Sequence, residues 1–494
     1  MFEAIELGQS LSRHEFKQAE RAFRTELLQL QGQLAEAGVA TLIIIAGVEG
    51  AGKGEVVNRL NKWLDSRGMA THAFWDETEE ETARPEYWRY WMRLPARASI
   101  AVMFGGWYWD PIHDHSTGKI DEAQLDEACH RIKAMETMLR QDGMLIIKLW
   151  FHLSKKTFKQ RADKRSEAAK YIRRPRGEAH GIDYDVFLRC AERVIRRTDT
   201  SSCPWNLIEA EDRWFRDMSV AQAIQARVRL QLGEHRLAER RVALPNPVVR
   251  LDASSATVLD TLDMGATLSK ADYKDQLKHY QGQLSRLLWQ AYAARTSTVI
   301  VFEGWDAAGK GGAIRRLTAA LDARLYRTYS VAAPSDEELA HHYLWRFWRR
   351  VPRAGYMTLY DRSWYGRVLV ERVEGLARPV EWRRAFQEIN DFEEQLVDSG
   401  TTVIKFWLHI SAEEQLRRFH QREQTPWKQY KITDDDWRNR DRREAYVEAL
   451  EEMVLRTSTA RAPWLLLPAD DKRYARVRVL KHVCERLESA LTAK

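Results

Sequence analysis

The sequence predicts an α/β fold of two tandem domains, each a parallel five-stranded sheet flanked by helices. The chain has 494 residues, enough for two ordinary domains that each bury a core. Short apolar or β-branched runs alternate with longer helical stretches, a pattern typical of a parallel sheet covered on both faces. A long internal repeat divides the chain into two similar halves.

The repeat relates whole domains. The segment from Thr41 to Lys53 parallels the segment from Thr298 to Lys310, and the two lysines are 257 positions apart (310 − 53). The same offset relates Trp88 and Trp345, Pro95 and Pro352, Trp107 and Trp364, and Lys148 and Lys405. Further on the offset is 259, as Trp205 and Trp464 show (464 − 205). So long a period excludes a solenoid and indicates a duplicated domain.

The domain boundaries follow from the repeat and from turn chemistry. We expect a first domain over 1–233, a linker over 234–264 and a second domain over 265–494. The expected linker contains Pro245-Asn246-Pro247 and the run from Asp252 to Ala256, which favour turns and show no clear hydrophobic period.

Each strand and helix of the second half is predicted from its own pattern. The expected strands are Thr298 to Phe302, Leu325 to Val331, Tyr356 to Tyr360, Thr402 to Leu408 and Trp464 to Leu467. The expected helices are Gly312 to Asp322, Asp336 to Arg350, Glu381 to Val397, Ala412 to Gln421 and Asp434 to Arg456. In the first half, Leu42 to Ala46 and Leu145 to Trp150 are the equivalent buried strands. Ligands of such sheets bind beyond the carboxyl ends of the strands.

Composition and charge restrict the class of protein. Hydrophobic residues make up 44% and charged residues 30%, as in soluble globular proteins, and the four cysteines lack metal-ligand spacing, which suits a reducing compartment. The strongest apolar run, Val39 to Val48, is too short to span a bilayer, so we expect a cytoplasmic protein with no membrane partner. A formal charge of +7 favours a polyanionic partner. Charge alone does not choose among nucleic acid, an anionic membrane and phosphate chains, but no nucleic-acid-binding signature is present, so nucleic acid is a minor alternative and is not expected as a partner.

Two glycine-rich loops follow predicted strands and precede predicted helices. Gly304 to Lys310 and Gly47 to Lys53 both fit G-x4-G-K, the phosphate-binding P-loop pattern. Backbone amides of such a loop and the start of its helix hold phosphate oxygens, here at Gly304, Gly309, Gly311 and Gly312, while Lys310 neutralises their charge. The sequence therefore predicts two tandem P-loop kinase-like domains. The alternative, a glycine turn with a solvated lysine, is more plausible for Lys53 than for Lys310.

The metal ligands of this loop depart from the usual pattern. Gly311 replaces the Ser or Thr whose hydroxyl would bind Mg²⁺, so another oxygen must hold the ion. We expect Asp306, inside the loop, and Asp361, at the end of a predicted strand, to be metal ligands. Arg362 would lie beside the transferring phosphoryl group, where its guanidinium can stabilise the developing charge.

The first half lacks two of these groups. Phe104 stands at the position of Asp361 and Gly105 at that of Arg362, although Glu49 matches Asp306. Because phosphoryl transfer depends on positioning and electrostatics, we expect this domain to be catalytically impaired or inactive.

A basic segment of the second half is a candidate lid. Arg418, Arg422, Lys428 and Lys431 lie in or before a loop that contains Pro and Gln, and a lid over a polyanion needs cations. A solvated helix face is the alternative for any single arginine. The tryptophans of the nearby run, Trp345 and Trp348, are expected to pack in the core.

Glu303 to Gly312 together with Tyr360 to Tyr365 resembles the polyphosphate kinase 2 family, and Arg456 to Trp464 fits the same pattern. The likeness covers nearly the whole chain, and the doubled architecture is similar to fused members that phosphorylate AMP. The resemblance implies transfer of a terminal phosphoryl group from inorganic polyphosphate to AMP, with Mg²⁺ bridging the phosphates. By matched position, Asp306, Lys310, Asp361 and Arg362 would be catalytic and Arg418 and Arg422 would belong to the lid.

Alternatives stay open at this point. Polyphosphate could instead phosphorylate nucleoside diphosphates, an ATP-dependent kinase has a similar fold, and a non-catalytic phosphate or nucleotide sensor would use the same loops. The oligomeric state is also open, with a homo-oligomer among the possibilities.

Overall fold

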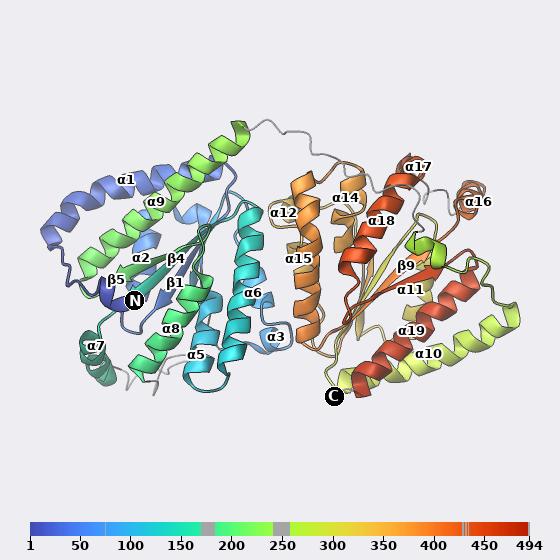
Figure 1. Ribbon diagram of the computed structural model, residues 1–494, viewed down its shortest axis with the longest axis horizontal. Coiled ribbons are helices and arrows are strands. Elements are labelled where there is room, and N and C mark those ends of the chain that lie inside the picture. The colour runs from blue at the N-terminus through green and yellow to red at the C-terminus, as the bar shows by residue number, and fades with distance from the viewer. Residues whose placement is uncertain are drawn as a thin grey trace. The chain divides into compact units, whose positions relative to one another are not determined.

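The computed structural model of the chain describes residues 1–74, 76–168, 183–240, 257–426, 429, 432 and 434–492, without the side chains of 162–168 and 237–240. Two similar α/β halves follow one another along the chain (Figure 1). Among the described residues, no helix combines the length and the apolar character needed to cross a membrane.

The first half contains five strands and a series of helices. The strands are β1 (Thr41–Gly47), β2 (Met69–Ala73), β3 (Ile100–Phe104), β4 (Leu145–His152) and β5 (Trp205–Glu209). The helices are α1 (Arg13–Glu36), α2 (Lys53–Trp63), α3 (Glu79–Thr82), α4 (Trp88–Trp91), α5 (Trp109–Ser116), α6 (Glu122–Gln141), α7 (Lys155–Ala168), α8 (Tyr184–Thr198) and α9 (Arg213–Arg240).

The second half repeats this order. Its strands are β6 (Thr298–Gly304), β7 (Tyr326–Ser330), β8 (Met357–Asp361), β9 (Thr402–His409) and β10 (Trp464–Pro468). Its helices are α10 (Lys270–Ala293), α11 (Lys310–Thr318), α12 (Asp336–Leu339), α13 (Trp345–Trp348), α14 (Val370–Val373), α15 (Pro379–Asp398), α16 (Ala412–Glu423), α17 (Asp434–Asp441), α18 (Arg443–Thr457) and α19 (Lys472–Thr492).

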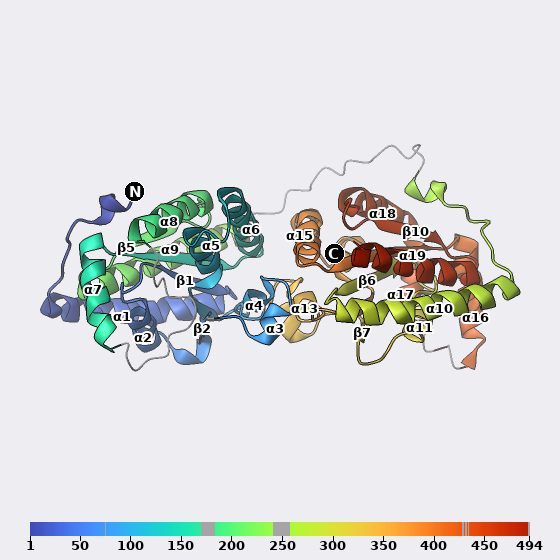
Figure 2. The same cartoon turned by 90° about the horizontal axis from the view of Figure 1, so that it is seen from below.

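Both sheets are parallel and have the same topology, in the order β2-β3-β1-β4-β5 and its counterpart β7-β8-β6-β9-β10. In the first half, helices α1, α2 and α9 cover one face of the sheet and α5, α6 and α8 cover the other; in the second half, α10, α11 and α19 lie opposite α15 and α18 (Figure 2). Every residue of β1 and β4 is buried, as expected for central strands covered on both sides. The predicted fold and all five predicted strands of the second half are confirmed.

Two predicted helices are interrupted. The stretch from Asp336 to Arg350 forms only the short helices α12 and α13, and the stretch from Asp434 to Arg456 is divided near Arg442 into α17 and α18. The residues from Tyr343 to Trp348 other than Arg346 are all large and apolar, so one straight helix could not turn them all toward the core. Trp345 and Trp348 are buried, which confirms that they pack in the core.

Contacts between residues divide the chain into two compact units. One comprises Met1–Thr78, Arg89–Pro247 and Ser335–His342, and the other comprises Glu79–Trp88, Val248–Pro334 and Tyr343–Lys494. Each unit therefore includes a short segment from the opposite half of the sequence. The expected linker, 234–264, begins inside α9, which continues to Arg240, and its residues 241–256 lie outside the described part.

A buried ion pair recurs in both halves. Lys405 donates from Nζ to Glu393 at 2.7 Å, to the Tyr365 hydroxyl at 2.9 Å and to the Thr457 carbonyl at 2.7 Å. Lys148 makes the same three bonds, at 2.8 Å to Glu136, 3.1 Å to Tyr108 and 2.8 Å to Thr198. A lysine with all three donors used and a carboxylate beside it can be buried without leaving an uncompensated charge.

Candidate active site

The phosphate loop of the second half lies between β6 and α11, as predicted. Gly304 has φ +143°, and a Cβ built there would meet the Leu408 carbonyl oxygen at 2.4 Å, so only glycine fits. Gly309 also has positive φ, +110°, where it precedes the helix. Lys310 curls back over the loop, its Nζ donating to the carbonyls of Gly304 at 2.6 Å and Trp305 at 3.2 Å. The loop amides and the start of α11, with Gly311 and Gly312, form an anion-binding cradle.

Asp306 and Arg362 meet beside this cradle. The guanidinium of Arg362 donates to Asp306 Oδ1 at 2.9 Å, and its side chain is 48% exposed while that of Asp306 is only 14% exposed. Burial alone would raise the pKa of Asp306, but the charges of Lys310 and Arg362, together with hydrogen bonds from Asn439 and Arg362, outweigh it and lower that pKa. Arg362 has φ +64°, an unfavourable conformation for a residue with a side chain, and such strain is concentrated at functional sites.

Asp361 ends β8 next to β6, where its backbone pairs with Phe302. One of its carboxylate oxygens is 3.8 Å from the position of a Cβ on Gly311, so it faces the start of α11. No group of three or more His, Cys, Asp and Glu side chains that could hold a metal occurs among the described residues. Mg²⁺ needs only one or two carboxylates together with phosphate and water oxygens, so Asp306 and Asp361 fit this ion.

Arg418 does not lie in a lid. Its side chain is buried, and all five N–H groups are engaged by the protein. Nη1 donates to the loop carbonyls of Ala307 at 2.9 Å and Ala308 at 3.0 Å, while Nη2 donates to Ala469 at 2.7 Å and Asp470 at 2.9 Å. The phosphate-binding role expected for Arg418 is therefore replaced by a structural one, a brace behind the loop. Arg161 braces the first loop in the same way, with Nη1 donating to Gly50 at 2.9 Å.

The other expected lid cations are less defined. Arg422 lies in the last turn of α16 and is partly exposed. Lys428 and Lys431 lie outside the described residues. Their assignment to a lid stays a prediction.

Sequence reasoning missed two contacts of Asp306. Asn439, on α17, donates from Nδ2 to Asp306 Oδ2 at 2.9 Å, and Asn439 Oδ1 accepts from the Tyr446 hydroxyl at 3.0 Å. Gln415, on α16, donates to the Asp306 carbonyl at 3.2 Å. Each comes from a helix more than a hundred residues further along the chain, and no local motif singled out either residue. They fix the loop aspartate from two sides.

The first loop has the same backbone but a different setting. Lys53 Nζ donates to Gly47 at 2.7 Å and Val48 at 2.9 Å, matching Lys310. Its Nζ lies 5.9 Å from the centre of the Phe104 ring, where the second half has Asp361. Gly105, at the position of Arg362, has φ +85° and so adopts this turn without strain.

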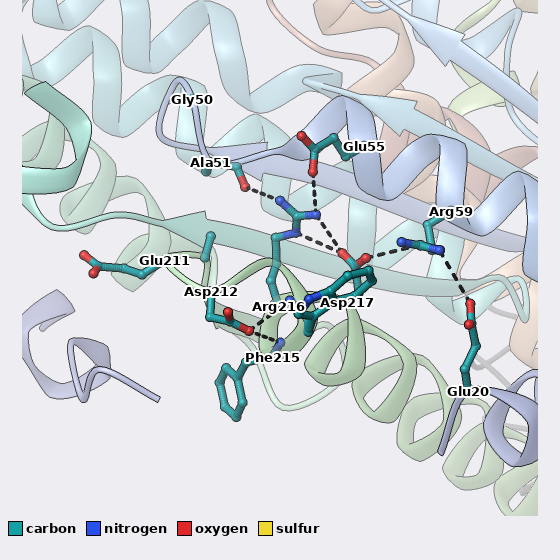
Figure 3. A network of polar contacts seen from close by, with 12 residues as sticks. Glu20, Gly50, Ala51, Glu55, Arg59, Glu211, Asp212, Phe215, Arg216 and Asp217 are labelled. Atoms are coloured by element: carbon teal, nitrogen blue, oxygen red, sulfur yellow. Dashed lines mark hydrogen bonds and ion pairs between the residues drawn. The ribbon is translucent and has the colours of Figure 1, made fainter. Parts of the chain in front are cut away.

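An ion network lies directly against the first loop (Figure 3). Arg216, buried on α9, donates to Glu55 at 2.9 Å and to Asp217 at 2.8 Å, and its Nη1 lies 3.4 Å from the Ala51 carbonyl. Arg59 extends the network to Asp217 at 3.2 Å and to Glu20 at 3.5 Å. A Cβ on Gly52 would be 1.7 Å from Arg216 Nη1, so the guanidinium fills the space that this glycine leaves.

Comparisons with known proteins agree with the geometry. The family model "Polyphosphate kinase 2 (PPK2)" matches residues 10–236 and 267–494. A polyphosphate:AMP phosphotransferase from Pseudomonas aeruginosa is 44% identical over 493 residues, covering 99% of each chain, and one from Acinetobacter johnsonii is 36% identical over 461 residues, covering 91% of each. A crystal structure described as polyphosphate kinase 2 from Pseudomonas aeruginosa superposes with a TM-score of 0.88 at 42% identity, covering 100% of both chains. The chain belongs to the polyphosphate kinase 2 family.

Proposed function

We propose that the second half transfers the terminal phosphoryl group of inorganic polyphosphate to AMP and produces ADP. The observation that carries this proposal is the group formed by Asp306, Lys310, Asp361 and Arg362 around one anion cradle. Full-length relatives that carry the name polyphosphate:AMP phosphotransferase support the choice of donor and acceptor.

The residues would divide the work of the reaction. Lys310 and the amides of Gly304, Gly309, Gly311 and Gly312 would hold the oxygens of the terminal phosphates. When phosphate binds, the guanidinium of Arg362 would leave Asp306. It would then bind the equatorial oxygens of the transferring phosphoryl group as negative charge spreads over them. Mg²⁺, held by Asp306 and Asp361, would neutralise the phosphate oxygens. We keep Arg422, Lys428 and Lys431 as proposed lid cations.

The transfer exchanges one P–O bond for another. A phosphate oxygen of AMP bonds to the terminal phosphorus of polyphosphate, and the bond from that phosphorus to the bridging oxygen breaks. The polymer leaves one phosphate shorter with the bonding electrons on its new terminal oxygen, and ADP is formed. We infer that the first half does not catalyse this step because Phe104 and Gly105 cannot supply a carboxylate and a guanidinium.

One assay tests the proposal. The full chain is incubated with Mg²⁺, polyphosphate of several lengths and AMP in the absence of ATP, and ADP is measured by chromatography. We expect ADP formation that requires both polyphosphate and Mg²⁺. No ADP with any donor length would contradict the proposal, and faster turnover with ADP as acceptor would favour nucleoside diphosphate phosphorylation instead.

A further inference from the structure

A second polar pair lies buried behind the candidate site. Ser363 donates from Oγ to Glu303 Oε1 at 2.8 Å, and the two residues are only 3% and 5% exposed. Placing a carboxylate in the interior is costly unless a specific interaction compensates it. None of the steps proposed above uses this pair.

The pair connects the two strand ends that carry the site. Glu303 lies on β6 immediately before the phosphate loop, and Ser363 follows Arg362 after β8. Ser363 Oγ also accepts from the Tyr365 amide at 3.2 Å, and the Arg362 amide donates to the Phe302 carbonyl at 3.0 Å. Hydrogen bonds therefore hold the chain on both sides of Arg362, the residue with the strained φ of +64°.

The surrounding charges favour this arrangement. Burial, with a smaller contribution from the charge of Asp361, raises the pKa of Glu303, while Lys310, the Ser363 bond and Arg362 each oppose that rise. Lys310 and Arg362 are both members of the proposed catalytic group. Glu303, on β6, is therefore close enough to these two cations for their charges to stabilise its carboxylate.

The duplicated half provides an internal control. At the 257-residue offset, Ala46 replaces Glu303 and Gly106 replaces Ser363. A Cβ on Gly106 would lie 3.3 Å from a methyl group of Ile44, so that site is closely packed against apolar atoms. The buried Lys405 cluster, by contrast, recurs around Lys148 with nearly the same distances. The cluster needed for the fold is present twice, whereas the Glu303–Ser363 pair occurs only beside Asp361 and Arg362.

From this difference we infer that Glu303 and Ser363 are positioning residues for phosphoryl transfer. They hold the turn after β8 so that the Arg362 guanidinium stays within reach of Asp306 and of a phosphate on the loop. This inference rests on the proposed function, because its readout is the transfer rate.

The test uses Glu303→Gln and Ser363→Ala in the full chain, singly and together. We expect kcat to fall about 10- to 100-fold, the range typical of residues that orient a ligand from behind. KM for donor and acceptor should change little, and the double variant should be no slower than the slower single variant. Ser363→Thr should recover most of the rate, because it restores the hydroxyl and Ser363 has extended φ, −153°, which suits a β-branched residue.

Glu136→Gln in the first half is the matched control. It also replaces a buried carboxylate by an amide, and it should lower stability without changing kcat of the folded protein. The inference is overturned if Glu303→Gln and Ser363→Ala retain full kcat, lose rate only in proportion to the folded fraction, or raise KM alone. A wild-type chain that is inactive with AMP contradicts the proposed function. The kcat of each variant relative to the wild-type chain is then measured with whichever acceptor supports turnover. Inactivity with every acceptor would overturn both.

Discussion

The two phosphate loops have nearly the same backbone but different electrostatic surroundings. Around the first loop, the guanidiniums of Arg216 and Arg59 are matched by the carboxylates of Asp217, Glu55 and Glu20. At the positions of Arg216 and Arg59, the second half has Ala475 and Arg316. At the positions of Asp217, Glu55 and Glu20, it has Arg476, Gly312 and Leu277, so two cations and no carboxylate occupy these five positions. Arg476 lies near the start of α11, within 3.3 Å of a Cβ built on Gly312.

This contrast shows that two loops with nearly the same glycine-rich backbone can lie in different electrostatic surroundings. The first loop retains its lysine and its glycines, but the nearby guanidiniums of Arg216 and Arg59 are paired with carboxylates. In the second half, Arg316 and Arg476 would attract a chain of phosphates, which carries a negative charge on each unit. Substitutions in the two halves measure how far they have diverged.

Asp361→Ala should reduce phosphoryl transfer by about 10³-fold, because the proposed carboxylate ligand of Mg²⁺ is lost. Lys53→Ala should retain most of the rate, because its loop faces Phe104. Steady-state ADP formation by the two variants is the measurement. Similar losses would mean that the first half takes part in the reaction.

Lys405→Met and Lys148→Met should each destabilise their own half by about 3–5 kcal/mol, the cost of leaving a buried carboxylate uncompensated. The two changes should be similar in size, because both lysines make the same three hydrogen bonds. Urea unfolding followed by tryptophan fluorescence would measure them. A large effect in one half only would show that the halves diverged in their cores as well as in their sites.

Arg362→Gly should be about 1 kcal/mol more stable than Arg362→Ala, since only glycine adopts φ +64° without strain. Both variants lose the guanidinium and should be equally inactive, so thermal unfolding isolates the cost of the turn. An alanine variant as stable as the glycine variant would mean that the turn relaxes once the arginine is removed.

Lys472, the first residue of α19, lies close enough to Arg418, the brace of the phosphate loop, for their charges to interact, so polyphosphate binding should depend on pH. Burial, with a contribution from Arg418, lowers the pKa of Lys472 to about 8, so its charge is present below pH 8 and is lost as the pH rises through that value. The KM for polyphosphate should therefore increase a few-fold between pH 7 and 9. Lys472→Arg, which stays charged, should flatten this change, and an unchanged pH profile would assign it to other groups.

Duplication made much of the fold predictable, because each strand could be checked against its counterpart. The positions of Lys310, Asp306 and Arg362 beside one another were also predictable, since they lie at strand ends or in the loop that joins a strand to a helix. The function of Arg418 was not, because helical spacing does not reveal whether a guanidinium turns toward solvent or toward buried carbonyls. The contact of Asn439 with Asp306 could not be predicted for a related reason: the two residues are 133 positions apart (439 − 306), and only the tertiary fold brings them together.

The arginine brace behind each loop has a thermodynamic consequence. Arg418 holds the carbonyls of Ala307 and Ala308 in place before any ligand arrives, so the loop is ordered in advance. A loop that is already ordered does not lose conformational entropy on binding, so more of the interaction energy appears as affinity. Arg161 makes a similar bond in the first half, from Nη1 to the Gly50 carbonyl, although Phe104 and Gly105 stand there at the positions of Asp361 and Arg362.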